Sequence, residues 1–257
     1  MKLEIVQGSF YYEGGETVLR DLNLAIGEGT FLGVLGRNGI GKTTFLKCLT
    51  GILRWSEGCT LFEGEVCQNI FDKSEVAYVP QAHPTAFPYT ALDMVCMGRS
   101  RKMGRFSMPS AKDRQIAMES LREMGISHLA DRECSRMSGG QLQMVYIARA
   151  LVTNPRLLIL DEPETHLDFK NQAEILKKLG IWVRQRNISC IMNTHYPEHA
   201  LKMADKVLLL GKEGDYAFGT TKDMMTSENI RRFFEVGAKI VDLQPLGIEK
   251  KVFVVCE

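Results

Sequence analysis

The sequence predicts an α/β protein whose central strands are buried on both faces. Three short and almost continuously apolar runs carry this prediction: Phe31 to Leu35, Leu157 to Leu160 and Ile188 to Asn193. Such runs are typical of parallel strands covered by helices on either side. Segments with helical spacing, Thr43 to Thr50 and Leu142 to Val152, follow the first run and precede the second. A chain of 257 residues, 45% hydrophobic and 25% charged, is long enough for one large α/β domain with a subdomain.

Ahead of the first apolar run, the sequence predicts an antiparallel ribbon. Leu3 to Tyr12 and Val18 to Ile26 have strand character on either side of a turn at Glu13 to Glu16. The second strand alternates apolar and polar residues, which indicates one buried face. The further expected elements are strands at Cys59 to Phe62, Glu75 to Val79, Ala204 to Leu210 and Lys251 to Val255, a short hairpin at Tyr216 to Thr220, a helical insertion between Thr90 and Met124, and a helical segment from Thr221 to Phe234.

Composition excludes several classes of protein. Lys and Arg number 32 against 31 Asp and Glu, and a net charge of +1 gives no case for a nucleic-acid or membrane-surface partner. The seven cysteines are odd in number and scattered, which argues against a disulfide framework or a zinc site and for reduced, cytosolic thiols. No apolar run approaches the roughly 20 residues that span a bilayer, and the amino terminus has no long apolar core. We therefore expect any membrane role to be exerted from outside the lipid.

A phosphate-binding loop follows the first apolar run. Gly36 to Thr44 has the sequence G-R-N-G-I-G-K-T-T and matches the template G-x-x-x-x-G-K-[ST]. Its glycines allow successive backbone N–H groups to point at phosphates. Lys42 adds a positive charge toward the β- and γ-phosphates, the Thr43 hydroxyl can ligate Mg²⁺, and the start of the next helix favours an anion. The expected nucleotide-binding residues of the loop are Gly36, Asn38, Gly39, Gly41, Lys42, Thr43 and Thr44.

Two acids, Asp161 and Glu162, end the second apolar run. Acids at the carboxyl end of a buried parallel strand lie where open α/β sheets bind ligands. Asp161 suits a direct or water-mediated hold on Mg²⁺, and Glu162 can orient and deprotonate an attacking water. A second anion site is predicted at Ser138 to Gln141, where a serine cap and two glycines expose N–H groups at the start of a helix.

Two ring side chains are open to more than one interpretation. Tyr12 can stack on a purine, although a strand aromatic is more commonly part of a core. His195 follows the third apolar run and can hydrogen-bond to a γ-phosphate or serve as an ordinary polar group. His195 and His199 have the spacing of a helical metal pair, but Pro197 between them and the lack of a third nearby ligand argue against metal.

Taken in order, these motifs resemble the nucleotide-binding subunit of an ABC transporter. The set comprises the phosphate loop, Gln81 after a strand, Met137 to Gln141, Leu157 to Pro163 (the acid strand), Thr165 to Asp168 and His195. It spans nearly the whole chain. The resemblance implies a P-loop NTPase (RecA-like) core with an antiparallel β subdomain and a helical ABC signature subdomain. It implies one ABC ATPase domain over 1–257, with an ATP-binding core at 1–88 and 154–235, a helical subdomain at 89–153 and a C-terminal tail at 236–257.

Three softer patterns resemble the ATPases of importers for iron-siderophore, haem and vitamin B12. They are Thr90 to Val95 with Gly98-Arg99, Pro109 to Arg114, and His128 to Arg132. Two positions depart from the family pattern, because Glu164 stands where Ser or Thr is usual and Met137 stands where Leu is usual. Neither position carries phosphate chemistry, so we expect an active ATPase.

The resemblance also implies a site shared by two copies of the chain, arranged head to tail. ATP on the phosphate loop of one copy would be closed over by the Ser138 to Gln141 turn of the other. The implied Mg²⁺ ligands are Thr43, Gln81 and Asp161; the implied catalytic residues are Glu162, His195 and Gln81; the further nucleotide and dimer contacts are Tyr12, Ser138, Gly139, Gly140, Gln141 and Asp168.

The implied partners are polytopic permease subunits and, through them, a substrate-binding protein, at the cytoplasmic face of the inner membrane. The helical insertion and Ala82 to Pro88 would form the groove that receives a permease helix. We assign no chemistry to the basic run Arg99, Arg101, Lys102 and Arg105, which is expected to be a solvated loop face. The thirteen methionines are best explained as core filling.

Other function classes are a soluble ABC-type ATPase without a transporter, a phosphate-loop kinase or small GTPase, and an exporter. The first usually needs a second cassette or a long coiled-coil insertion, for which the segment from Thr44 to Ser138 is short. The second has no use for the Ser138 to Gln141 turn. Exporters often carry fused membrane helices, which moderately favours import here.

Overall fold

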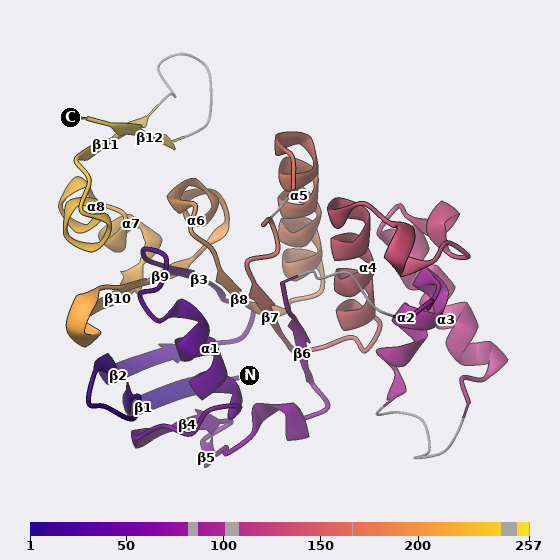
Figure 1. Ribbon diagram of the computed structural model, residues 1–257, viewed down its shortest axis with the longest axis horizontal. Helices are drawn as coiled ribbons and strands as arrows, with labels where there is room; N and C mark the ends of the chain where they lie inside the picture. Colours follow the sequence, from indigo (N-terminus) through magenta and orange to yellow (C-terminus); the bar gives the residue numbers. More distant parts are fainter. Residues whose placement is uncertain (82–86, 101–107, 166, 243–250, 257) are drawn as a thin grey trace. The chain divides into compact units, whose positions relative to one another are not determined.

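The computed structural model describes residues 1–81, 87–100, 108–165, 167–242 and 251–256. The chain divides into two compact units, Met1–Asp72 with Ser189–Glu257 as the first and Lys73–Ile188 as the second (Figure 1). Each unit contains both helices and strands. We describe each unit by itself.

An antiparallel sheet forms the amino-terminal part of the first unit. Its strands are β1 (Leu3–Tyr11), β2 (Thr17–Ile26), β4 (Glu57–Phe62) and β5 (Glu65–Val66), in the order β2-β1-β4-β5. Strand β1 pairs with β2 on one side and with β4 on the other. The predicted ribbon is thereby confirmed, and apolar positions such as Leu22 are completely buried.

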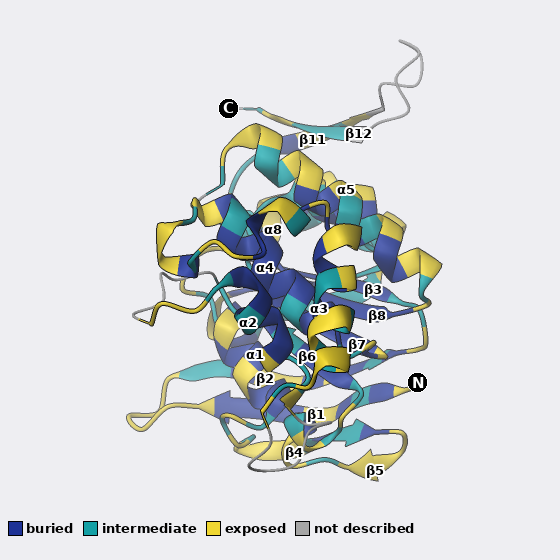
Figure 2. Cartoon of the chain, turned by 90° about the vertical axis from the view of Figure 1, so that its right-hand side faces the viewer, coloured by how far each residue is buried: buried dark blue, intermediate teal, exposed yellow. Residues whose placement is uncertain are grey.

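Parallel strands form the second sheet of this unit. Strand β3 (Phe31–Leu35) lies between β8 (Ser189–Asn193) and β9 (Lys206–Leu210), and it is parallel to both. Strand β10 (Tyr216–Thr220) closes one edge as the antiparallel partner of β9, as the predicted hairpin requires. Every residue of β3 and β8 is buried, which explains their continuous apolar sequence (Figure 2).

Helices and a terminal ribbon complete the first unit. They are α1 (Lys42–Thr50), α6 (Pro197–Met203), α7 (Thr221–Met224), α8 (Ser227–Phe234), β11 (Ala238–Asp242) and β12 (Lys251–Val255). A cluster of buried residues that includes Leu35, Leu209, Ile230 and Phe233 joins β3, β9 and α8. Strand β12 was expected, whereas its antiparallel partner β11 was not.

The helical segment predicted from Thr221 to Phe234 is confirmed, but it consists of two helices. Helix α7 ends at Met224, and Met225 takes the non-helical angles φ −86° and ψ 74°. The Thr226 hydroxyl then accepts a hydrogen bond from the Asn229 N–H at 3.2 Å and starts α8. A threonine inside a helical pattern favours a new N-cap because its hydroxyl satisfies an otherwise unpaired N–H group.

The second unit contains one parallel strand pair and four α-helices among its described residues. Strand β6 (Val76–Val79) pairs in parallel with β7 (Leu157–Asp161), and all five residues of β7 are buried. The helices are α2 (Ala91–Met97), α3 (Ala111–Glu123), α4 (Gly139–Leu151) and α5 (Phe169–Gln185). In α4 the predicted apolar face is buried, including Leu142 and Val145.

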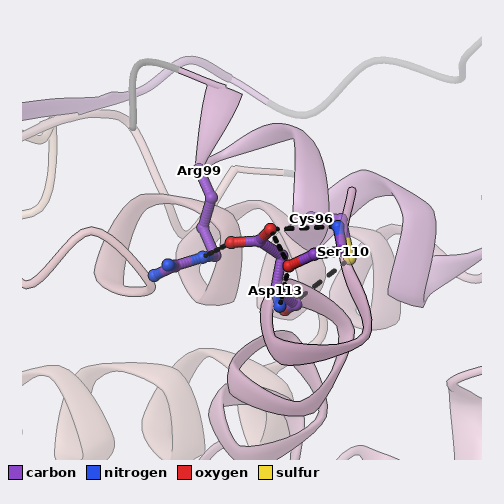
Figure 3. A network of polar contacts seen from close by, with 4 residues as sticks. All are labelled: Cys96, Arg99, Ser110 and Asp113. Atoms are coloured by element: carbon purple, nitrogen blue, oxygen red, sulfur yellow. Dashed lines mark hydrogen bonds and ion pairs between the residues drawn. The ribbon is translucent and has the colours of Figure 1, made fainter. Parts of the chain in front are cut away.

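An ion pair ties the end of α2 to the start of α3. The Arg99 Nε donates to the Asp113 Oδ1 at 2.7 Å, and each side chain is only 13% exposed (Figure 3). The Ser110 N–H donates to the Asp113 Oδ2 at 3.0 Å, which completes a capping box for α3. The expectation of a solvated loop face is therefore wrong for Arg99. Arg101, Lys102 and Arg105 lie outside the described residues.

In the part of the chain that the structure describes, no helix is both long and apolar enough to cross a membrane. The same residues contain no cluster of three or more His, Cys, Asp or Glu side chains that could hold a metal ion.

The Asp113 ion pair predicts a pH-dependent contribution to stability. The Ser110 hydroxyl and then the Arg99 guanidinium lower the pKa of Asp113 to about 2. Because this pKa lies below its unfolded value, the stabilisation is complete above about pH 4 and is lost as the pH falls toward 2. We expect Asp113→Asn to lower the Tm by roughly 2–4 °C at pH 7. Thermal melts at pH 7, 5 and 3.5 should show a constant difference that begins to shrink at the lowest pH; an unchanged difference there contradicts this account.

Candidate functional site

The phosphate loop of the first unit connects β3 to α1. Lys42 is only 4% exposed, and its ammonium donates to the carbonyl oxygens of Gly36 at 2.9 Å and Arg37 at 3.0 Å. These bonds fold the loop around the lysine side chain. They hold the loop in a fixed shape around the Lys42 side chain. A loop of this shape at the start of α1 can bind an anion.

Two glycines of this loop occupy positions that no other residue fits. Gly36 has φ 150°, and a Cβ there would lie 2.6 Å from the Leu210 carbonyl oxygen. Gly41, the N-cap of α1, has φ 113°, and a Cβ there would lie 2.5 Å from a Val18 methyl carbon. The loop therefore depends on glycine for both its backbone angles and its space. Such a cradle fits the phosphates of a nucleotide.

Tyr12 lies beside this loop. It is 48% exposed, packs edge-on against Phe10 with ring centroids 4.9 Å apart, and its hydroxyl is 3.2 Å from the Thr44 hydroxyl. The alternative in which Tyr12 is buried in a core is therefore wrong. An exposed ring anchored next to the phosphate loop is available to stack on a base.

His195 follows β8 at the same edge of the sheet. Strands β3 and β8 are parallel with Val34 opposite Asn193, and the Thr194 N–H donates to the Val34 carbonyl at 3.1 Å. Both strands therefore end side by side, and His195 extends from the same edge as the phosphate loop. The His195 and Tyr196 rings are 4.0 Å apart, whereas His199 Nδ1 lies 3.4 Å from the Thr194 hydroxyl.

The second unit places Gln81, Asp161 and Glu162 together at one strand edge. Strands β6 and β7 are parallel with Val79 opposite Leu160, so Asp161, the last residue of β7, lies at the same strand ends that Gln81 and Glu162 follow. Asp161 is 8% exposed, and the Tyr78 hydroxyl donates to its Oδ2 at 3.3 Å. Burial and the Asp161 charge raise the pKa of Tyr78, so its hydroxyl remains a donor.

Glu162 has an unusual backbone. Its φ of 46° lies in the left-handed region, which costs a non-glycine residue about 1–3 kcal/mol. The turn is held by the Thr165 N–H, which donates to the Glu162 carbonyl at 3.1 Å, and by the Thr165 hydroxyl, 3.2 Å from Glu162 Oε2. Strain of this kind is common at reactive positions, since the fold must impose it.

The turn Ser138 to Gln141 starts α4 with a complete capping box. The Gln141 N–H donates to the Ser138 hydroxyl at 3.4 Å, and the Ser138 N–H donates to Gln141 Oε1 at 3.2 Å. Ser138 and Gly139 are exposed, whereas Gly140 is buried. The predicted serine cap is thereby confirmed.

Asp168 is the N-cap of α5, and Phe169 beside it is 92% exposed. Asp168 Oδ1 accepts from the Asn171 N–H at 2.8 Å, and Oδ2 accepts from the Asn171 side-chain amide at 2.9 Å. His166 of the Thr165 to Asp168 motif lies outside the described residues.

Sequence reasoning missed two polar partners, Tyr78 and Asn171. Tyr78 stands in a strand whose predicted role was structural, and only its register against β7 brings its hydroxyl to Asp161. Asn171 was identifiable as the third residue of a helix capped by Asp168, a pattern that indicates a cap contact. The structure thus groups Tyr12, the phosphate loop and His195 in the first unit, and Gln81, Asp161 and Glu162 in the second.

Comparison with known proteins gives the same family throughout. The family model for "ABC transporter" matches residues 19–165. The chain is 38% identical to the molybdate import ATP-binding protein MolC of Haemophilus influenzae, covering 91% of this chain and 88% of the relative. It is 32% identical to the iron(3+)-hydroxamate import ATP-binding protein FhuC of Bacillus subtilis, covering 89% and 86%.

A solved structure described as an inward-facing conformation of a metal-chelate type ABC transporter superimposes with a TM-score of 0.89. It is 35% identical and covers 99% of this chain and 97% of that chain. A second solved structure, the ATP-binding cassette MJ1267 in its ADP conformation, has a TM-score of 0.79 at 22% identity and supports the fold alone. The structure has the phosphate loop, the acid strand and the signature turn, which is the turn from Ser138 to Gln141. The chain belongs to the ABC transporter family and is one of its ATP-binding, ATP-hydrolysing subunits.

Proposed function

We propose that this protein is the ATPase subunit of a membrane importer, and that its cargo is a metal chelate of the iron-siderophore, haem or cobalamin type. The observation that carries the importer proposal is the match to import ATPases along nearly the whole length of both chains. MolC imports molybdate and FhuC imports an iron hydroxamate, so an oxyanion cargo is the alternative within the same class. The neighbouring solved structure favours a metal chelate.

In this proposal the phosphate loop holds ATP. Lys42 contacts the β- and γ-phosphates, with Asn38 and Thr44 among the loop residues around them. Tyr12 stacks on the adenine, which its exposure and its position beside Thr44 support. His195 extends from the same sheet edge as the loop and contacts the γ-phosphate.

The hydrolytic residues are those of the acid strand. Mg²⁺, when bound, neutralises phosphate charge, and Thr43, Gln81 and Asp161 are oxygen donors of the kind that it prefers. Glu162 orients and deprotonates the attacking water, and its strained backbone supports a role that requires an exact carboxylate position.

Importer ATPases of this family work as dimers with membrane permease subunits. We place Ser138, Gly139, Gly140 and Gln141 against the ATP held by a second copy, with Asp168 at the dimer contact. The capped start of α4 supports this, because Ser138 and Gly139 are exposed there. ATP closes the dimer through contacts of its γ-phosphate, and hydrolysis removes those contacts.

The permease side of the protein is proposed to be the helical part of the second unit. Large apolar side chains are exposed there: Phe87 (64%), Tyr89 (38%), Met97 (37%) and Met108 (87%). The Phe87 and Tyr89 rings are 5.8 Å apart and form a small aromatic surface suited to an amphipathic helix. The predicted groove also includes Ala82 to Pro88, of which residues 82–86 lie outside those described. The subunit would then be a peripheral protein at the cytoplasmic face of the inner membrane.

The deciding experiment is co-purification from the native membrane. We expect a polytopic chain to accompany the protein and the complex to hydrolyse MgATP. A substrate-binding protein or cargo identified through that chain then decides between metal chelate and oxyanion. Active ATPase with only soluble partners would move the protein to a non-transport class.

Replacement of Glu162 should separate ATP binding from hydrolysis. We expect Glu162→Gln to reduce turnover at least about a hundredfold, because the general base is lost, and to accumulate an ATP-bound dimer in size-exclusion chromatography. Lys42→Ala is the contrasting variant, with ATP affinity itself reduced about tenfold or more. A steady-state rate of ATP hydrolysis by Glu162→Gln equal to that of the unaltered protein would contradict the assignment of Glu162 as the general base.

The Tyr78 hydroxyl should affect the Mg²⁺ dependence of hydrolysis. Tyr78→Phe removes the bond to Asp161 Oδ2, and we expect the Mg²⁺ concentration for half-maximal turnover to rise about tenfold. Tyr216→Phe is the matched control, since the Tyr216 hydroxyl also bonds to the protein, at Asp21 and Asn23 of the first unit. Identical Mg²⁺ curves for both variants would refute a role of Tyr78 in holding Asp161.

A charge on the aromatic surface should prevent permease binding. We expect Phe87→Glu to lose most of the co-purifying permease, because a carboxylate replaces an exposed ring at the centre of the proposed contact. Val66→Glu, at a residue that is 66% exposed in the first unit, is the control and should keep the permease. Equal recovery of permease with both variants would place the contact elsewhere.

A further inference from the structure

The side chain of Asn171 joins two functional segments of the second unit. On one side it holds Asp168: the Asn171 N–H binds Oδ1 at 2.8 Å and the Asn171 Nδ2 binds Oδ2 at 2.9 Å. Both oxygens of the N-cap carboxylate are therefore engaged by one residue. The cap of α4 differs, because its third residue, Gln141, binds the backbone N–H of Ser138 and leaves the Ser138 hydroxyl a single bond.

On its other side, Asn171 packs against the signature turn. A Cβ on Gly140 would lie 3.2 Å from the Asn171 Cγ and 3.3 Å from its Nδ2. The Asn171 side chain therefore fills the space beside Gly140, in the first turn of α4. A displacement of that turn toward α5 meets this side chain, whose Nδ2 is bonded to Asp168 Oδ2.

We propose that Asn171 is a positioning residue that holds Asp168 and the Ser138 to Gln141 turn in one fixed arrangement. The inference rests on the proposed function, in which both segments face a second copy of this chain. A signature turn that presents N–H groups to a phosphate must be placed to within a fraction of an ångström, because misplacement by about 1 Å can reduce a rate a hundredfold. Asn171 supplies this placement without touching nucleotide.

The amide is the group that this position requires. Leucine has a similar size and fills the contact with Gly140, but it cannot donate to Asp168. Aspartate keeps the shape but places a second carboxylate at 2.9 Å from the first, where like charges repel. Only a planar side chain with a donor satisfies both neighbours.

The test compares Asn171→Leu and Asn171→Asp with Asn229→Leu. Asn229 is the matched control, since it is also the third residue of a capped helix, its N–H binds Thr226 and its Nδ2 binds the Met224 carbonyl at 2.8 Å. We expect all three variants to show similar small decreases in Tm. Only the Asn171 variants should lose turnover, by at least about tenfold in kcat, while the monomer's affinity for a fluorescent ATP analogue stays within about twofold.

A second readout uses the Glu162→Gln background, in which ATP is expected to accumulate the dimer. Adding Asn171→Leu should abolish the ATP-dependent dimer, whereas adding Asn229→Leu should not. An undiminished dimer and an unchanged kcat with Asn171→Leu overturn the positioning role while leaving the proposed function intact. Failure of Glu162→Gln alone to form the dimer overturns the head-to-tail arrangement itself, and this inference with it.

Discussion

The buried ammonium of Lys42 is the interaction on which the nucleotide site depends. A charged group that is 4% exposed is tolerated only where hydrogen bonds replace its hydration, and the Gly36 and Arg37 carbonyls do so here. The loop is thus organised before an anion arrives, which removes the cost of rearrangement at the moment of binding.

The register of the parallel strands places the other site residues at the sheet edges. Because β3 lies between β8 and β9 in parallel register, the loop after β3 and the residues after β8 leave the same edge of one sheet. Strand β7 does the same for the acids in the second unit, where its partner β6 brings Gln81 to the edge beside Asp161. Parallel strands thus bring side chains that are remote in sequence to one edge of a sheet. The functional side chains lie at the strand ends, so the central strands themselves can be wholly apolar.

The sequence predicted most of the strands to within two residues, because an apolar run between turn residues leaves few alternatives. It also predicted the serine cap of α4 and the phosphate loop, both of which depend on local residue types. It failed where a contact depends on tertiary register. The Tyr78 bond to Asp161 joins strands 83 positions apart, and the Arg99 pair with Asp113 needs the packing of α2 against α3. No local pattern contains this information.

Helix α5 was not predicted, although the sequence contains the apolar periodicity of a helix there. Its buried residues follow helical spacing along one face, from Ile175 and Leu176 through Leu179 to Trp182 and Val183. The break between α7 and α8 shows the converse, since a helical pattern continued across Thr226 although its hydroxyl favours a new start. Capping chemistry therefore decides helix boundaries that periodicity alone does not determine.

The turn at Glu164 is held in part by contacts of its backbone. This side chain is wholly buried, at a position where the family pattern has Ser or Thr. The backbone of the turn is fixed by other groups: the Leu167 N–H donates to the Glu164 carbonyl at 3.3 Å, and the Gln172 amide donates to the Glu164 and Leu167 carbonyls. Helix α5 therefore holds two backbone carbonyls of this segment through the single side chain of Gln172. Because these bonds are made to the backbone, a change of residue type at 164 does not in itself remove them.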